Sequence, residues 1–132
     1  MAISIQLRDG MIESVWRGTI TLEDIQHLLK YVEDRESNLP VAPDRLMDLS
    51  PAQVLDFRSS DLIAIAQLRH SAALKNKVKS AIVAPSPEQF GLARMFQAYN
   101  QNPAIHLFIF RESLPAYEWL GVKPNSHDQT EA

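Results

Sequence analysis

The chain carries four histidines, the side chains that most often bind metals or transfer protons near neutral pH. They are His27, His70, His106 and His127. A helical metal site needs two histidines four residues apart, and no pair of these has that spacing. His106 interrupts an apolar run that predicts a buried strand, near the N-terminal end of that strand. We therefore expect no metal site, and we interpret His106 as a core or rim residue.

Carboxylates are concentrated in one stretch that contains Asp44, Asp48, Asp56 and Asp61. Paired acid catalysis needs two carboxyl groups at a defined separation, which spacing along the sequence does not establish. No serine lies in the Gly-x-Ser-x-Gly turn that exposes a nucleophile in hydrolases. We interpret these aspartates as helix caps and turn residues, and we expect neither catalytic residues nor a cofactor.

Strands and helices are predicted to alternate along the chain. Asp9-Gly10 joins two runs of alternating apolar residues, which predicts an antiparallel hairpin over residues 3–8 and 11–16. Helices are predicted to begin near residues 22, 59, 87 and 113, and strands are predicted over 44–50, 78–84 and 104–110. The order β-β-α-β-α-β-α-β-α predicts an α/β fold with a mostly parallel mixed sheet and helices packed against it.

Two of the predicted helices have capping signatures at their starts. Thr21 is followed three residues later by Asp24, and Ser86 is followed by Gln89 with a proline between them. In such a capping box each side chain bonds the backbone N–H of the other residue, which satisfies donors that the first helical turn leaves free. We expect both helices to start at these residues.

The carboxyl ends of the predicted strands form the first candidate site. Ligands of open parallel sheets bind outside these ends, where the following helices begin. Asp48, Ser50, Ser86 and Arg111 are predicted to meet at this edge. Helix N-termini and Arg111 would favour an anion there, whereas Asp48 opposes one and no glycine-rich phosphate loop is present.

Surplus apolar residues on the second and third predicted helices form the other candidate site. Ile63 lies outside the main apolar stripe of the second helix, and Phe90 lies outside that of the third, one turn before Arg94. A helix on an open sheet normally shows one apolar face. The surplus indicates either contact between the two helices or a surface for a small apolar ligand or a partner helix.

The composition is that of one ordinary domain. The 132 residues are 45% hydrophobic and contain no cysteine, and the formal net charge is -3. This charge does not favour nucleic acid, and no apolar run reaches the roughly 18 residues of a membrane span. We expect a single soluble, cytoplasmic domain over residues 1–123, followed by a polar, disordered tail over 124–132.

Several segments match a known family in order and spacing. They are residues 46–50, Asp56, 59–62, 91–96, 108–110 and 116–120. Together they resemble the STAS-like family, whose SpoIIAA-like fold is that of the anti-sigma-factor antagonists. The resemblance implies a non-enzymatic module that docks a regulatory protein or, as in some lipid-transfer relatives, accommodates a small apolar molecule.

Ser60 corresponds to the serine that a kinase phosphorylates in anti-sigma-factor antagonists, in an aspartate-serine-serine-glycine motif. In this chain Phe57 and Arg58 separate Asp56 from the serines, and Asp61 replaces the glycine. A carboxylate beside the hydroxyl would repel an incoming phosphate, whereas Asp61 and a serine also make an ordinary helix start. The resemblance therefore implies Ser60 as a candidate phosphorylation site, and helix capping is the alternative.

These observations favour a non-catalytic binding or regulatory module. We expect its surface to include Ser60, Ile63, Phe90 and Arg94, and to receive a small apolar ligand or a partner helix. A phosphorylation-switched interaction domain acting through Ser60 is the alternative, and an enzyme is the least favoured class. Self-association into a homodimer through an exposed sheet edge or the second helix is a further expectation.

Overall fold

An antiparallel hairpin opens the fold, as predicted. The computed structural model describes residues 2–124, so the predicted disordered tail over 124–132 lies outside the described residues except for Pro124. Strands β1 (Ile3–Arg8) and β2 (Met11–Trp16) pair antiparallel. Asp9 and Gly10 both have positive φ, 50° and 72°, which suits the tight turn that joins twisted strands.

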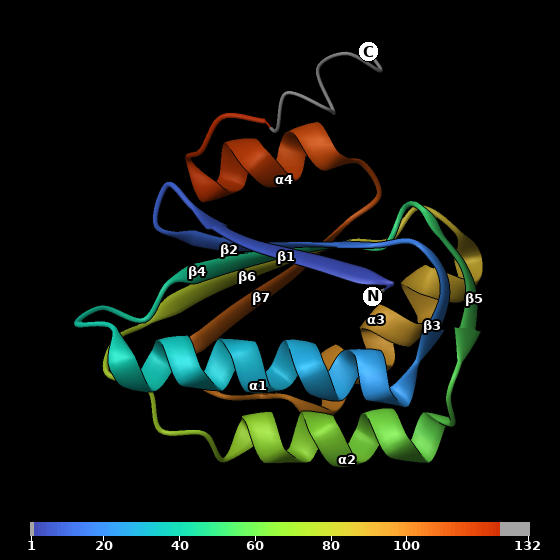
Figure 1. The fold of residues 1–132 in the computed structure, drawn as a ribbon, viewed down its shortest axis with the longest axis horizontal. Helices are drawn as coiled ribbons and strands as arrows, with labels where there is room; N and C mark the ends of the chain where they lie inside the picture. The colour runs from blue at the N-terminus through green and yellow to red at the C-terminus, as the bar shows by residue number, and fades with distance from the viewer. Residues whose placement is uncertain (1, 125–132) are drawn as a thin grey trace.

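The hairpin is one side of a five-stranded sheet with the order β1-β2-β4-β6-β7 (Figure 1). Strands β4 (Asp44–Asp48), β6 (Val78–Val83) and β7 (Ile105–Phe110) run parallel to β2. This confirms the predicted mostly parallel mixed sheet. Asp48 is in register with Val83, which is in register with Phe110, so these three strands end at the same edge.

A second, two-stranded parallel sheet was not predicted. It is formed by β3 (Gly18–Thr21) and β5 (Ala52–Asp56). Gly18 has a φ of 65°, which turns the chain out of β2 and into β3. Both strands are short, and Gln53 and Val54 of β5 are exposed, so neither strand has an alternating pattern long enough to identify it.

Helices cover both faces of the large sheet (Figure 1). Helices α1 (Leu22–Asn38), α2 (Ser59–His70) and α3 (Pro87–Tyr99) pack on one face, and α4 (Ser113–Leu120) packs on the other. Each face of the sheet therefore has its own apolar core. Because side chains alternate along a strand, each central strand contributes residues to both of these cores. No helix in the described part of the chain is long and apolar enough to cross a bilayer.

Both predicted capping boxes are present. Thr21 Oγ1 accepts from the Asp24 N–H at 3.3 Å, and the Asp24 carboxylate accepts from the Thr21 N–H at 2.9 Å. Ser86 and Gln89 make the same exchange at 3.1 and 3.2 Å. Gln89 also donates to the Leu49 carbonyl at 2.7 Å. The start of α3 is therefore tied to the carboxyl end of β4.

A buried carboxylate holds α4 to the sheet. Glu13 projects from β2 toward α4 and is 1% exposed. Its Oε2 accepts a short hydrogen bond from the Tyr117 hydroxyl of α4. Its Oε1 accepts from Arg8 Nε and from Gln6 Nε2, both at 2.8 Å. Charge-assisted bonds of this kind offset the cost of burying the charge.

Replacing Tyr117 by phenylalanine should remove the donor from α4 without leaving a large cavity. We expect Tyr117→Phe to lower the free energy of unfolding by about 1–3 kcal/mol, the usual cost of depriving a buried charged group of one bond. Urea denaturation followed by circular dichroism measures this loss. The exposed Tyr99 provides the control, and a Tyr117→Phe loss no larger than that of Tyr99→Phe would contradict this role.

Candidate functional site

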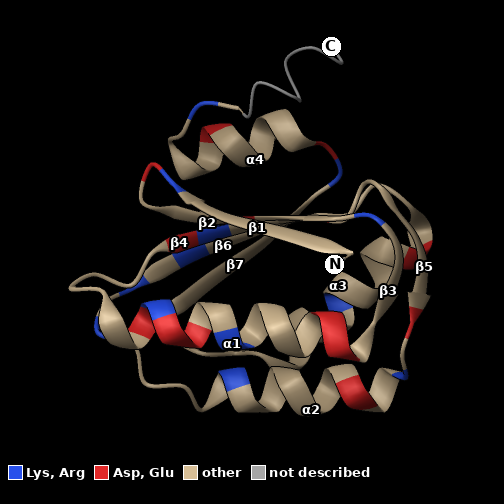
Figure 2. Cartoon of the chain, viewed as in Figure 1, with Lys and Arg blue, Asp and Glu red and all other residues tan. Residues whose placement is uncertain are grey.

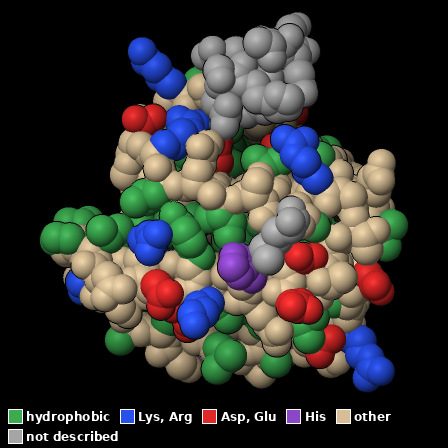
Figure 3. Space-filling view, in the orientation of Figure 1, with side chains coloured by type: hydrophobic (Ala, Val, Ile, Leu, Met, Phe, Trp, Pro, Cys, Tyr) green, Lys and Arg blue, Asp and Glu red, His purple; other side chains and the backbone are tan. Residues whose placement is uncertain are grey.

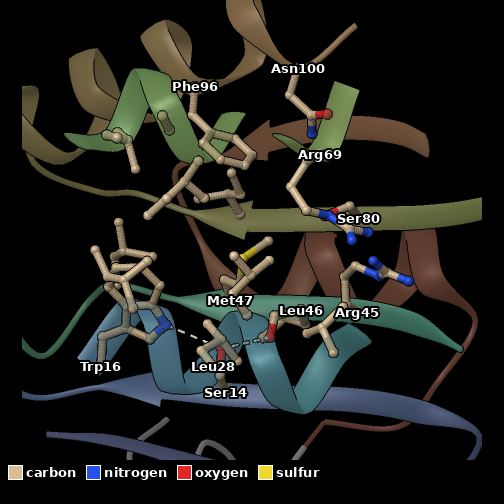
Figure 4. Close-up of a pocket in the computed structure, with 18 of the residues that line it drawn as sticks. Ser14, Trp16, Leu28, Arg45, Leu46, Met47, Arg69, Ser80, Phe96 and Asn100 are labelled. Atoms are coloured by element: carbon tan, nitrogen blue, oxygen red, sulfur yellow. Dashed lines mark hydrogen bonds between the residues drawn. The ribbon is translucent and has the colours of Figure 1, made fainter. Parts of the chain in front are cut away.

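A cavity of about 100 Å³ lies between the large sheet and helices α1, α2 and α3 (Figure 4). Strands β2, β4, β6 and β7 form its floor and the three helices form its roof. It exists because small side chains, among them Ser14, Ser80 and Ala93, line it where larger ones would fill the space. This is a pre-formed space of the kind that small ligands occupy.

Most of the lining is apolar. Trp16, Met47 and Ile82 rise from three neighbouring strands, and Leu28 and Phe96 descend from α1 and α3. Trp16 is fixed in place by its indole N–H, which donates to Ser14 Oγ at 3.1 Å. An apolar cavity of this size stays dry or accepts a small apolar molecule, because water finds too few partners there.

Polar side chains gather at one end of the cavity. Arg45, Arg69 and Asn100 lie together on the side opposite Trp16 (Figure 4). Arg45 of β4 is in register with Ser80 of β6, near the N-terminal ends of both strands. The polar end of the cavity is therefore opposite the sheet edge at which we expected a site.

Glu36 near the end of α1 joins the two arginines. Its Oε2 accepts from Arg45 Nη1 at 2.8 Å and from Arg69 Nη2 at 2.5 Å, and its Oε1 accepts from Arg69 Nη1 at 3.0 Å. Arg45 and Arg69 are each 5% exposed. Two buried guanidinium groups thus share one carboxylate, and the cluster has a net positive charge.

Burial and charge act in opposite directions on the pKa values of this cluster. Burial raises the pKa of Glu36, but the hydrogen bond from Arg69 and the charges of both arginines outweigh it, so this pKa lies below its ordinary value. Burial lowers the pKa of Arg45, and the nearby Arg69 charge acts in the same direction, against the effects of Glu36 and of Asp44. The pKa of Arg45 therefore lies below its ordinary value.

Acid should weaken this cluster. The folded-state pKa of Glu36 is below its ordinary value of 4.5. The ionised Glu36 side chain therefore stabilises the fold fully above about pH 4.5, and this stabilisation is lost as pH falls through the lower, folded-state pKa. The free energy of unfolding should decline below about pH 4.5 in the native chain. The decline should be shallower in Glu36→Gln, where Asp24, whose pKa is also lowered, still titrates. Urea titrations across this range test this, and identical pH profiles would contradict it.

Two buried polar atoms at this end have no hydrogen-bond partner among the described residues. They are Arg45 Nε and Asn100 Oδ1. Arg45 donates from Nη1 to Glu36, and it donates from Nη2 to the Pro43 carbonyl at 3.0 Å. Nearly all buried polar groups in proteins are bonded, so each such atom requires an explanation.

The predicted strand-end residues do lie at one edge, but their side chains bond to nearby backbone groups of the chain. Asp48 Oδ1 accepts from the Ser50 N–H at 2.9 Å, and Ser86 caps α3. Arg111 Nη1 donates to the Pro85 carbonyl at 3.2 Å. None of these four residues lines the cavity.

The predicted surface on α2 and α3 lies outside the cavity as well. Ser60 is exposed in the first turn of α2, and Ile63 is half-buried. Phe90 is half-buried beneath Arg111, whose Cζ lies 3.9 Å from the ring centroid, and Arg94 lies 5.9 Å from it. The apolar residues of α2 and α3 that line the cavity are others, namely Leu62, Ile65, Leu92, Ala93 and Phe96.

The start of α2 differs from the expected serine cap. Arg58 is the N-cap, and the Asp61 carboxylate accepts from its N–H at 3.2 Å. Ser59 and Ser60 are the first two helical residues, and both are exposed. Asp61 therefore plays its predicted part in the helix start, while the serines do not cap it.

Sequence reasoning missed Glu36, Arg45, Arg69 and Asn100. A signal was present, because Arg69 continues the buried stripe of Leu62, Ile65 and Ala66 at helical spacing. Arg45 likewise interrupts a short apolar strand. A charged residue at a position that the pattern assigns to the core indicates a buried ion pair, although the partner is not identifiable from the sequence.

The visible surface gives no sign of a nucleic-acid interface. Acidic and basic residues lie close together on α1 (Figure 2). On the face shown in Figure 3 the two kinds of charge are interspersed, with no continuous basic stripe. Among the described residues, no group of three His, Asp or Glu side chains is arranged to hold a metal ion.

Comparison with known proteins identifies the fold. No family model matches the chain, and no curated protein matches it. Among solved structures, the chain is similar to an uncharacterised protein of the DUF3478 family with a SpoIIAA-like fold from Shewanella loihica PV-4. The two share 19% sequence identity with a TM-score of 0.59, and the match covers 90% of this chain and 92% of that one. The chain therefore has the SpoIIAA-like fold, which confirms the fold that the sequence resemblance implied.

Proposed function

We propose that this domain is a non-catalytic binding module that holds a small ligand in the cavity beneath α1, α2 and α3. The cavity carries the proposal, because it is lined almost entirely by apolar side chains and is formed before any ligand enters. The ligand is the small apolar molecule expected from the sequence, but it binds at the inner faces of α2 and α3 and not on their outer surface. The protein would bind this ligand in the cytoplasm.

The polar groups of the cavity support binding over catalysis. Ser14 Oγ accepts from Trp16 and donates to the Leu46 carbonyl at 3.4 Å, so this hydroxyl is already engaged. Glu36 is bonded to both arginines, which oppose its acting as a base. The groups that meet here can orient a ligand, and none forms a nucleophile–base pair.

A titration of the full chain with benzene tests the proposal. Two tryptophans serve as internal reporters, since Trp16 lines the cavity and Trp119 packs on the opposite face of the sheet. We expect benzene to shift the NMR signal of the Trp16 indole N–H and to leave that of Trp119 unchanged. A Trp16 signal that does not respond at saturating benzene would contradict the proposal.

A phosphorylation-switched interaction surface around Ser60 is the second candidate. Its support is that Ser60 is exposed at the start of α2, with the half-buried Ile63 one turn further on. Under this alternative Ser60→Asp should change the capture of a protein partner or the formation of a homodimer, while benzene binding in the cavity should be unaffected. Native mass spectrometry of Ser60→Asp and Ser59→Asp, the neighbouring control, separates the two candidates.

A further inference from the structure

We infer that the ligand of this cavity is a small carboxylic acid, whose anionic head lies at Arg45, Arg69 and Asn100 and whose short aliphatic or single-ring body fills the apolar end. This inference rests on the proposed function and specifies its ligand class. It combines the charge of the polar end, its unpartnered atoms and the volume of the cavity.

The charge of the polar end favours an anion. Arg45 and Arg69 are deeply buried, and among the described residues the Glu36 carboxylate alone is bonded to them, while Asp44 acts on Arg45 only through its charge. A buried charge without a counter-charge is costly, and proteins almost always pair it. A ligand carboxylate would supply a second bonded carboxylate, so that the two guanidinium groups would no longer share one.

The nearby helix ends do not cancel this charge. Helix C-termini carry partial negative charge, and α1, α2 and α3 all end near the cluster. However, the Ser37 and Leu39 carbonyls at the C-terminal end of α1 accept from Lys75 Nζ at 3.2 and 2.5 Å. The Arg69 and Ala72 carbonyls at the end of α2 accept from Asn102 Nδ2, both at 2.8 Å. These carbonyls are therefore satisfied, and Lys75 adds a further positive charge.

The unpartnered atoms favour an anionic head group. Arg45 Nε is a donor and has no partner among the described residues. A guanidinium group offers donors in a planar fork that matches a carboxylate. The buried Asn100 oxygen is likewise free, and rotating the amide by 180° puts its NH2 group at that position. In that orientation Asn100, like Arg45, can donate to an anion at this end of the cavity.

The volume limits the body of the ligand. An apolar cavity of about 150 Å³ holds benzene, so the cavity of about 100 Å³ found here limits the apolar body, apart from the carboxylate at the polar end, to at most a five-carbon chain or one small ring. A long-chain fatty acid does not fit the space as it stands. The test series is therefore hexanoate, its neutral isostere hexanamide, and hexylamine, which has the opposite charge.

The experiment titrates the full chain with each of the three compounds and follows the Trp16 and Trp119 indole signals. We expect hexanoate to shift Trp16 alone, and hexanamide to bind at least about tenfold more weakly, since a hydrogen bond to a charged group is worth that factor or more. Hexylamine should not bind. Hexanamide binding as tightly as hexanoate would overturn the carboxylate assignment and leave the proposed function standing. Failure of all three compounds and of benzene would overturn both.

A charge-changing variant tests the position of the head. Arg45 is part of a buried ion cluster, so substituting it endangers the fold, whereas Asn100→Asp keeps the shape of the side chain. We expect Asn100→Asp to weaken hexanoate binding at least about tenfold and to weaken hexanamide binding less, because only the anion is repelled by the added negative charge. The control is Gln53→Glu, the same change of charge on the exposed strand β5. Equal losses in the two variants, or no loss in Asn100→Asp, would overturn the assignment.

Discussion

Glu36→Gln should be among the most destabilising single substitutions in the chain. Among the described residues, Glu36 is the one carboxylate bonded to Arg45 and Arg69, and its loss leaves the two buried guanidinium groups without a bonded anion. Breaking a buried ion pair in this way costs about 3–5 kcal/mol, against a total stability of about 5–15 kcal/mol for an ordinary domain. Urea denaturation at neutral pH measures the loss.

Glu33→Gln is the matched control for this prediction. Glu33 lies on the same helix and is exposed, so the substitution removes the same charge without disturbing a buried cluster. We expect it to change stability by less than about 0.5 kcal/mol. Similar losses of stability for Glu33→Gln and Glu36→Gln would mean that the ion pairs of Glu36 with Arg45 and Arg69 do not stabilise the fold.

Ala93→Leu should abolish ligand binding. Ala93 lies on α3, is 3% exposed and lines the cavity, so a leucine at this position projects into the space that the ligand would occupy. Filling a pre-existing cavity with an apolar side chain is commonly neutral or stabilising by about 0.5–2 kcal/mol, so the loss of binding should not reflect unfolding. Benzene and hexanoate titrations, read at the Trp16 indole, measure the effect.

The control for the filling experiment is Ala98→Leu. Ala98 is on the same helix but exposed, so the added side chain enters solvent and the cavity keeps its volume. We expect Ala98→Leu to bind benzene like the native chain. Native-like binding by Ala93→Leu would show that the response of Trp16 comes from a site other than this cavity.

The elements that could be predicted are those with strong local rules. The hairpin follows from Asp9-Gly10, both of which adopt positive φ, and the starts of α1 and α3 follow from their capping boxes. The parallel strands follow from short apolar runs between helices, and their shared edge follows from the topology. In each case the signal lies in residues close together in the sequence or in the order of the elements.

The strands β3 and β5 and the cavity could not be predicted for a different reason. β3 and β5 are stabilised by each other across a long sequence separation, and neither has a local pattern. The cavity depends on which small side chains from three helices and four strands face one another. The ion cluster joins Glu36, Arg45 and Arg69 from α1, β4 and α2, and no local pattern identifies such a set.

The site predicted on the outer faces of α2 and α3 stays a prediction, and one of its residues is largely covered by a polar side chain. Ile63 and Phe90 are apolar and lie off the main stripes, which suggested a surface for a ligand. Phe90 is covered by Arg111, whose guanidinium group stacks on the ring. A long polar side chain can therefore cover an apolar residue that the pattern leaves unexplained.

The most direct test of the central claim is a crystal structure of the full chain under xenon pressure. Xenon enters apolar cavities and is located by its electron density. We predict a xenon atom beneath α3, in contact with Ile82, Ala93 and Phe96, and none at that position in Ala93→Leu crystals. Native crystals without xenon density in this cavity would contradict the claim that it is a pre-formed binding site.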